Sequence, residues 1–139
     1  MLYDAVEQPG AVSLDELRAA YDDELRSAID SLGTDAAADA ADVSEETVAN
    51  GVLDLTLEQA ASILEHVDGN PDADAIVFEY RDHLLMGMTS GILDVDTLAA
   101  EVDYDASGQE VQQAIEGRIS SPLSELAAIH HAIAVRNER

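Results

Sequence analysis

The sequence of 139 residues predicts an all-α protein, and three observations lead to this prediction. Apolar residues recur at helical spacing over most of the chain, and no segment alternates apolar and polar residues long enough to indicate a strand. Serine, threonine or aspartate precedes most of these apolar runs, where such residues cap helix N-termini. Glycine or proline ends most of the runs. We therefore expect a compact bundle of about eight helices.

Four helices are expected in the first half of the chain, each beginning at a capping residue. The capping residues are Ser13, Thr34, Ser44 and Thr56. Ser13 and Thr56 begin capping boxes, in which glutamate or glutamine stands three positions later. The first and third helices end at Gly33 and Gly51, and the fourth ends at the Gly-Asn-Pro sequence of residues 69–71.

The second half begins with the most apolar segment of the chain, residues 74–91. Its apolar residues cover a broad face and small residues gather at its C-terminal end, so several neighbours can pack against it. We therefore expect this helix at the centre of the bundle. Three further helices are expected near residues 95–102, 108–116 and 122–133. A capping box at Ser107 begins the second of these, and Ser121-Pro122 begins the last.

One pattern occurs twice, in residues 34–67 and 97–133: two short helices, a glycine and a longer amphipathic helix. Shifting the first segment by 66 positions aligns four pairs of glycine or apolar residues. The pairs are Gly51 with Gly117, Leu57 with Leu123, Ile63 with Ile129, and Val67 with Ile133. Such self-similarity is typical of a structural repeat. We interpret residues 1–139 as one helical domain with a repeat on either side of the central helix.

Each repeat resembles the helix-turn-helix of repressor-type DNA-binding domains, in which a small turn precedes a capped recognition helix and a glycine follows it. In the first repeat the matching residues are Ala38, Val43, Ser44, Val48 and Gly51. In the second they are Ala99, Val102, Tyr104, Val111, Ile115, Gly117, Arg118, Pro122 and Leu123. The resemblance implies two degenerate helix-turn-helix-like units around the helix of residues 74–91. Such units can serve DNA binding, protein contacts or plain packing.

Acidic residues dominate the polar composition. Thirty Asp and Glu stand against six Arg and no Lys, so the net charge is −24. The acids are spread along the chain, 17 in residues 1–70 and 13 in residues 71–139, and 47% of residues are hydrophobic. This distribution favours a surface adapted to concentrated salt over a one-sided mimic of nucleic acid or a disordered chain.

The composition also limits the chemistry and the location of the protein. The chain has no cysteine, which excludes disulfides and thiolate metal sites. No apolar stretch approaches the ~20 residues of a membrane span, and the N-terminus lacks the features of a signal peptide. We therefore expect a protein of the cytoplasm that does not enter a membrane.

Four runs of sequence are similar to a small family of uncharacterised proteins found in halophilic archaea. The runs are residues 55–61, 81–89, 93–97 and 115–118. The resemblance extends over most of the chain and implies a halophilic source. The family has no assigned function, so the resemblance implies no site.

Gln112, Gln113 and Arg118 are the best candidates for contacting a partner, because the C-terminal half has the less negative charge. Amide and arginine side chains can also read base edges, so nucleic acid can bind through residues 107–118. Affinity for DNA comes largely from Lys and Arg on phosphates, however, and the chain has no basic patch. The composition therefore favours a protein partner or a second copy.

Glu79, Asp82 and His83 lie within about one helical turn, a spacing found in metal sites on helices. No His-Glu-x-x-His motif accompanies them, so we interpret His83 as a histidine at the rim of its helix and expect no metal, no cofactor and no catalytic residue. His130 and His131 are expected on different faces of the last helix, one at an interface and one in solvent.

These observations predict a non-enzymatic interaction or regulatory protein of a halophile. One alternative is a helix-turn-helix transcriptional regulator that binds DNA. The other is a small metal-binding protein or enzyme that uses the glutamate, aspartate and histidine of residues 79–83.

Overall fold

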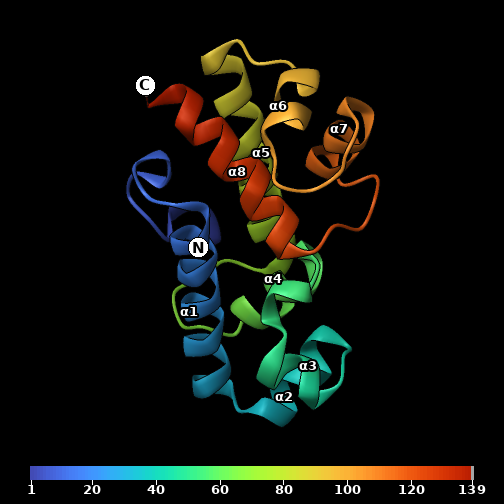
Figure 1. Ribbon diagram of the computed structural model, residues 1–139. Coiled ribbons are helices and arrows are strands. Elements are labelled where there is room, and N and C mark those ends of the chain that lie inside the picture. The colour runs from blue at the N-terminus through green and yellow to red at the C-terminus, as the bar shows by residue number, and fades with distance from the viewer. Residues whose placement is uncertain (139) are drawn as a thin grey trace.

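The computed structural model describes residues 1–138, and within this range it contains eight α-helices, three short 3₁₀ helices and no strand (Figure 1). This confirms the all-α prediction. The α-helices are α1 (Leu14–Leu32), α2 (Thr34–Ala41), α3 (Glu45–Asn50), α4 (Leu57–Leu64), α5 (Ala73–Gly91), α6 (Val95–Glu101), α7 (Gly108–Glu116) and α8 (Leu123–Asn137). The 3₁₀ helices are η1 (Leu2–Asp4), η2 (Pro9–Ala11) and η3 (Val52–Asp54). None of the helices in this range is both long and apolar enough to cross a bilayer.

Local capping sets where most of the helices begin. In all three predicted capping boxes, the hydroxyl of Ser13, Thr56 or Ser107 accepts a hydrogen bond from the backbone N–H three residues later. The start of α8 differs from the prediction, because Pro122 is its N-cap rather than its first helical residue. Pro122 is extended and forms a bridge with Thr56, so the helix begins one residue later.

The second half of the chain repeats the order of helices in the first half. The helices α1 and α5 have 19 residues each, and two short helices and a further core helix follow each of them. The buried residues of α1 have counterparts 59 positions later in α5: Leu17 with Ile76, Tyr21 with Tyr80, and Leu25 with Leu84. The same shift relates the N-caps Ser13 and Asp72 and the C-caps Gly33 and Ile92. The common order therefore includes the long helices, which lie outside the two segments that are alike in sequence.

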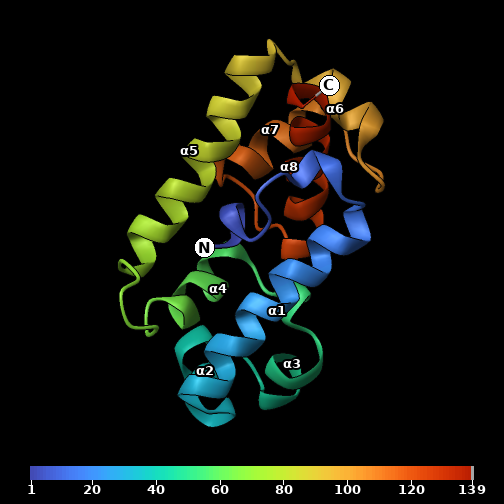
Figure 2. The ribbon, with the colours of Figure 1, turned by 90° about the vertical axis from the view of Figure 1, so that its left-hand side faces the viewer.

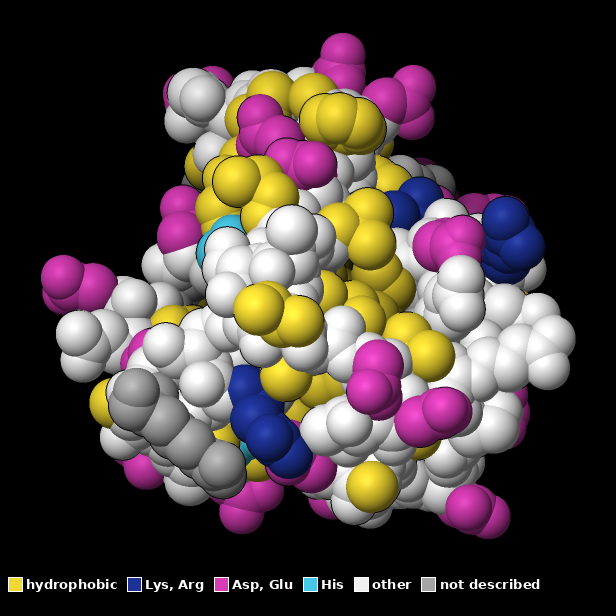
Figure 3. Space-filling model, turned by 90° about the horizontal axis from the view of Figure 1, so that it is seen from above, with side chains coloured by type: hydrophobic (Ala, Val, Ile, Leu, Met, Phe, Trp, Pro, Cys, Tyr) yellow, Lys and Arg dark blue, Asp and Glu magenta, His cyan; other side chains and the backbone are white. Residues whose placement is uncertain are grey.

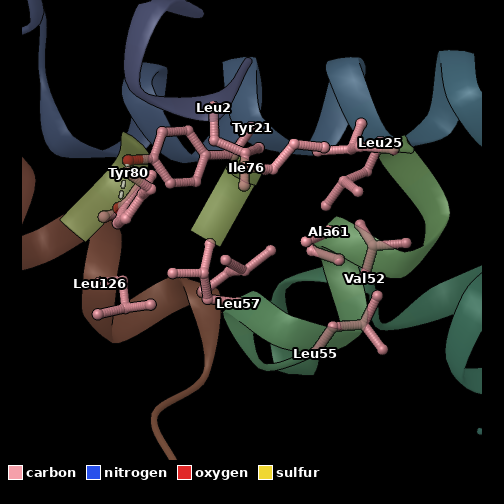
Figure 4. Packing of buried hydrophobic residues seen from close by; sticks show 14 of the residues in the cluster. Leu2, Tyr21, Leu25, Val52, Leu55, Leu57, Ala61, Ile76, Tyr80 and Leu126 are labelled. Carbon is pink, nitrogen blue, oxygen red and sulfur yellow. Dashed lines mark hydrogen bonds between the residues drawn. The ribbon is translucent and has the colours of Figure 1, made fainter. Parts of the chain in front are cut away.

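The two halves meet through equivalent residues. The hydroxyls of Tyr21 and Tyr80 lie 2.7 Å apart in a hydrogen bond, and their rings meet edge to face (Figure 4). Thr56, which precedes α4, forms an antiparallel bridge with Pro122, which precedes α8. Contacts between equivalent residues are what a two-fold axis generates. The same arrangement puts α2 and α3 at one end of the molecule and α6 and α7 at the other (Figures 1 and 2).

The most buried helix is α8, which corrects the expectation that residues 74–91 occupy the centre. Nine residues of α8 are buried, against three of α5. The helix α8 contacts α1, α5, α6, α7, η2 and η3, whereas α5 contacts α4, α7, α8 and η1. The reason is that the apolar residues of α5 divide between two faces: Ile76, Tyr80 and Leu84 enter the core, while Phe78 and Leu85 do not.

Two adjacent leucines test this division of α5. Leu84 is buried in the core and Leu85 is 44% exposed. We expect Leu84→Ala to lower the free energy of unfolding by about 2–5 kcal/mol through loss of burial and creation of a cavity. We expect Leu85→Ala to change it by less than about 1 kcal/mol. Urea unfolding in high salt measures both, and equal losses would contradict the position of α5.

Candidate functional site

The large hydrophobic residues that are exposed within residues 1–138 all lie in the second half of the chain. They are Phe78, Leu85, Met86, Ile92 and Ile119. Phe78 is the only phenylalanine of the chain and is 70% exposed. Apolar side chains that gather on a protein surface mark interaction sites. On a surface this rich in carboxylates, their concentration along α5 and its C-terminal end identifies a candidate site.

Two adjoining grooves lie along α5 and α7, with volumes of about 510 Å³ and about 390 Å³. They share Leu85, Ile115 and Glu116, and we treat them as one surface, the α5–α7 groove. Its apolar lining residues are Val77, Phe78, Leu85, Met88, Leu93, Val95 and Ile115. The end of the molecule that carries α6 and α7 shows apolar side chains in a depression, with acidic side chains around it (Figure 3).

Carboxylates border the α5–α7 groove. They belong to Asp74, Asp82, Asp94 and Glu116. Two predicted partner-contact residues converge on Glu116: the side-chain amide of Gln112 donates to its Oε1 at 3.0 Å, and Nη2 of Arg118 lies 3.4 Å from its Oε2. The third candidate, Gln113, is half-buried on α7 and does not line the groove. The structure therefore brings Gln112 and Arg118 to the edge of the groove.

Among residues 1–138, Arg81 is the only basic residue that lines the groove. Its guanidinium forms an ion pair with Glu58 of α4 and lies directly over Gly117, the C-cap of α7. A side chain at Gly117 would collide with this guanidinium. Arg81 therefore ties three helices together, and its charge is already neutralised within the chain.

The first half of the chain shows which apolar residues of α5 the fold requires. At the equivalent outward positions, 59 residues earlier, α1 carries small or polar side chains. The pairs are Ala19 with Phe78, Arg26 with Leu85, and Ser27 with Met86. The three positions that are buried in both helices, in contrast, carry large apolar or aromatic side chains in each half. The fold is therefore built without large apolar side chains at these outward positions.

Arg26 bridges α1 and α3 in the first half, at the place that corresponds to the α5–α7 groove. Its Nε donates to Asp22 Oδ1 at 2.7 Å, and its Nη1 donates to the backbone carbonyl of Ala49 on α3 at 2.8 Å. Leu85 stands at the equivalent position of α5 and has no donor to bridge to α7. The second half consequently has an open apolar groove where the first half has a polar bridge.

Ile92 combines exposure with backbone strain. It is 93% exposed and ends α5 with φ 51° and ψ 48°, a left-handed conformation. A β-branched residue in this region is a rare exception, and the equivalent residue of α1 is Gly33, which also has positive φ. Strained backbone of this kind persists where a side chain has a role besides folding. Ile92 does not line the α5–α7 groove, but it directly precedes Leu93, which does.

The weak metal candidates Glu79, Asp82 and His83 are not brought together as a group of three metal-ligating side chains. No group of three or more histidine, aspartate or glutamate side chains within residues 1–138 is arranged to hold a metal ion. The ring of His83 instead lies against Tyr3, with centres 5.0 Å apart, and meets the ring of His130 at a right angle. Burial lowers the pKa of His83, and two nearby carboxylates oppose that shift.

Comparison with known proteins gives a family and no activity. A family model described as "Family of unknown function (DUF5791)" matches residues 17–136, which include all eight α-helices except the first three residues of α1 and the last of α8. The chain belongs to this family. No curated protein and no solved structure is significantly similar to it. The function of this DUF5791 protein therefore has to be argued from its geometry.

A network of three polar side chains, His130, Tyr21 and Tyr80, is buried in the core of this DUF5791 protein. His130 is 2% exposed, its Nδ1 lies 2.6 Å from the Tyr21 hydroxyl, and that hydroxyl bonds to Tyr80. Burial, together with the neighbouring His83 and His131, lowers the pKa of His130 to about 3. Burial also raises the pKa of both tyrosines. All three side chains of this network are therefore neutral near pH 7.

The strain at Ile92 can be measured. We expect Ile92→Gly to raise the free energy of unfolding by about 1 kcal/mol, because glycine adopts positive φ without a steric cost. Asp42 has a similar backbone conformation, with φ 57°. Asp42→Gly is the control and should raise the free energy of unfolding by less, because aspartate tolerates the left-handed conformation better than isoleucine does. Chemical denaturation compares the two, and a loss of stability in Ile92→Gly would contradict the strain.

The neutral buried His130 predicts a dependence of stability on pH. The unfolded chain binds a proton at this histidine below about pH 6.5, whereas the folded protein does so only near pH 3. Stability is therefore lost as the pH falls, by about 2 kcal/mol between pH 8 and pH 5. His130→Leu should remove this part of the dependence, and the exposed-site control His66→Gln should retain it. Unfolding in 2 M KCl at several pH values measures the difference, and identical curves for His130→Leu and the wild type would contradict it.

Proposed function

We propose that this protein is a non-enzymatic interaction protein whose α5–α7 groove binds an amphipathic helix of a different protein. The observation that carries the proposal is the difference between the two halves. Arg26 bridges α1 to α3, whereas Leu85, in the equivalent position, lines an open apolar groove. A helix fills such a groove with apolar side chains spaced three or four residues apart.

The rim of the groove defines the charge of the partner. Asp74 and Asp82 are exposed at this rim, whereas Glu116 is paired with Arg118, Asp94 caps α6, and Arg81 is paired with Glu58. Arg or Lys on the flanks of the partner helix would form ion pairs with the carboxylates of this rim. A second copy of the chain would bring the same carboxylates into direct contact with this rim, where salt screens least. Like charges across an interface are unfavourable, so we propose a basic helix from another protein rather than self-association.

The alternative of DNA binding through helix-turn-helix-like units has less support. All five arginines within residues 1–138 form ion pairs with carboxylates of the same chain. Arginines held in this way contribute little to phosphate contacts, which supply most of the affinity for DNA. Arg118 is the most exposed of them and tests this alternative. We do not propose the metal-binding or enzymatic alternative, because the residues suggested for it do not converge.

We further propose that the protein works in the concentrated cytoplasmic salt of a halophilic archaeon. The support is the ratio of thirty acids to six arginines and the absence of lysine. At about 1 M salt the Debye length is only ~3 Å, so repulsion among the surface carboxylates is screened. Ion pairs in direct contact, such as those between the groove rim and a basic helix, act at about this distance and are the least screened.

Binding of a designed peptide tests the proposed groove. A synthetic helix as long as α5 (19 residues), with leucines on one face and arginines beside them, should bind to the protein in 2 M KCl. A version with glutamate in place of each arginine should bind about tenfold more weakly. Phe78→Ser and Leu85→Ser should abolish binding, because they remove apolar anchors from the groove. Fluorescence anisotropy of labelled peptides measures both effects.

Met86→Ser is the matched control, because Met86 is an exposed residue of α5 that lies outside the α5–α7 groove. Equal binding of the two peptides would contradict the proposed charge of the partner. A dimer in analytical ultracentrifugation that Leu85→Ser dissociates would replace the basic helix with a second copy. Binding of genomic DNA that Arg118→Ala weakens would favour the DNA-binding alternative.

Salt should stabilise the folded protein. We expect the melting temperature to rise by about 10 °C or more between 0.1 M and 2 M KCl, equivalent to roughly 2–3 kcal/mol for a chain of this size. The reason is screening of the repulsion within a net charge of −24. Sorbitol at equal osmolality is the control, because it is excluded from the protein surface but does not screen charge. A melting temperature that does not depend on KCl would contradict the proposed adaptation to salt.

A further inference from the structure

His130 stands at a position where the first half of the chain has a leucine. Shifting by 66 positions aligns α8 with α4 and places His130 on Leu64, which is buried. The preceding pair in the same register, Ile63 and Ile129, is apolar and buried in both helices. The fold is therefore built with an apolar side chain at this position, and burial of an imidazole there calls for another explanation.

One ring nitrogen of His130, Nε2, lacks a hydrogen-bond partner. When Tyr80 donates to Tyr21 and Tyr21 donates to Nδ1 of the neutral histidine, every group is satisfied except Nε2–H. The Nε2 atom is buried and has no hydrogen-bond partner within residues 1–138. The opposite direction of donation would leave both Nε2 and the hydroxyl hydrogen of Tyr80 unsatisfied, which costs more free energy. Nε2–H is therefore a buried donor that lacks an acceptor.

A groove of about 400 Å³ lies beside this histidine, between the N-terminal segment, α5 and α8. His130 contributes to its lining together with the buried apolar residues Pro9, Leu84 and Ile133. Glu7 and Glu138 are exposed lining residues, and no arginine of residues 1–138 lines the groove. The volume lies at the small end of the range for ligand sites, about 300–1,000 Å³. The two carboxylates disfavour an anionic ligand.

We propose that this groove binds a small neutral molecule whose carbonyl oxygen accepts a hydrogen bond from Nε2 of His130. The oxygen supplies the missing acceptor, and the apolar side chains of Pro9, Leu84 and Ile133 contact the rest of the molecule. His83 is the movable part of the site: its ring meets that of His130 at a right angle with centres 5.4 Å apart, and it is exposed on its other side. The proposal requires that rotation of His83 uncovers Nε2, because this atom is buried. The groove shares no lining residue with the α5–α7 groove, so the two sites are independent.

Two probes of the same shape test the proposal. Cyclohexanone carries a carbonyl oxygen, and methylenecyclohexane carries a CH₂ group in its place. Full-length protein labelled with [¹⁵N]histidine is titrated with each probe and followed by NMR in 2 M KCl. We expect cyclohexanone to shift the Nε2 resonance of His130 and to bind about two- to tenfold more tightly than the hydrocarbon, the effect of one neutral hydrogen bond.

Variants separate binding from folding. His130→Leu should remain folded, because the equivalent residue is Leu64, and should bind both probes equally. His83→Ala should keep the preference for cyclohexanone and speed the exchange of the Nε2 hydrogen with water. His66→Ala, a control at an exposed histidine outside the groove, should behave as the wild type.

Three results would overturn the proposal. One is equal affinity of the wild type for the two probes. Another is an Nε2 resonance that neither probe shifts at saturation. The third is hydrogen exchange at Nε2 that does not change in His83→Ala. Comparison of probes on the wild-type protein keeps the test valid even if a variant fails to fold.

Discussion

The fold depends on the hydrogen bond between Tyr21 and Tyr80, which joins the two long helices at equivalent positions. A buried phenol needs a partner for its hydroxyl, because an unsatisfied polar group in a core is costly. Each tyrosine here supplies the partner of the other, so the two halves satisfy this requirement only by packing together (Figure 4). The bridge between Thr56 and Pro122 is a second contact between equivalent residues, because these residues are the N-caps of α4 and α8. The remaining helices pack around these contacts.

Comparison of equivalent positions in the two halves shows which residues the fold needs and which differ for another reason. Positions that face the core stay apolar or aromatic in both long helices, as burial requires. The differences fall elsewhere. Leu85 replaces Arg26 and opens a groove, and His130 replaces Leu64 and introduces a buried polar group. These differences lie at two separate grooves, so the features that distinguish the second half from the first define both candidate sites.

Only part of the candidate site was predictable from the sequence. Gln112 and Arg118 were singled out by their chemistry, and they do lie at the edge of the α5–α7 groove. The exposed face of α5 was not foreseen, because Leu84 and Leu85 fit the same apolar pattern and only the packing of α5 against α4 and α8 distinguishes them. The 59-residue shift between the tyrosines was a usable signal, but it became apparent only once their hydroxyls were seen to meet.

The sequence by itself determined the all-α class, the helix starts at the capping boxes, the acidic surface and the likeness of residues 34–67 to 97–133. These properties arise from composition or from interactions within a few residues, such as a hydroxyl capping a nearby N–H. The tertiary structure decided that α8 rather than α5 is the most buried helix, that His130 is buried and that Phe78 is exposed. Burial depends on which distant segments pack together, and no local pattern specifies that choice.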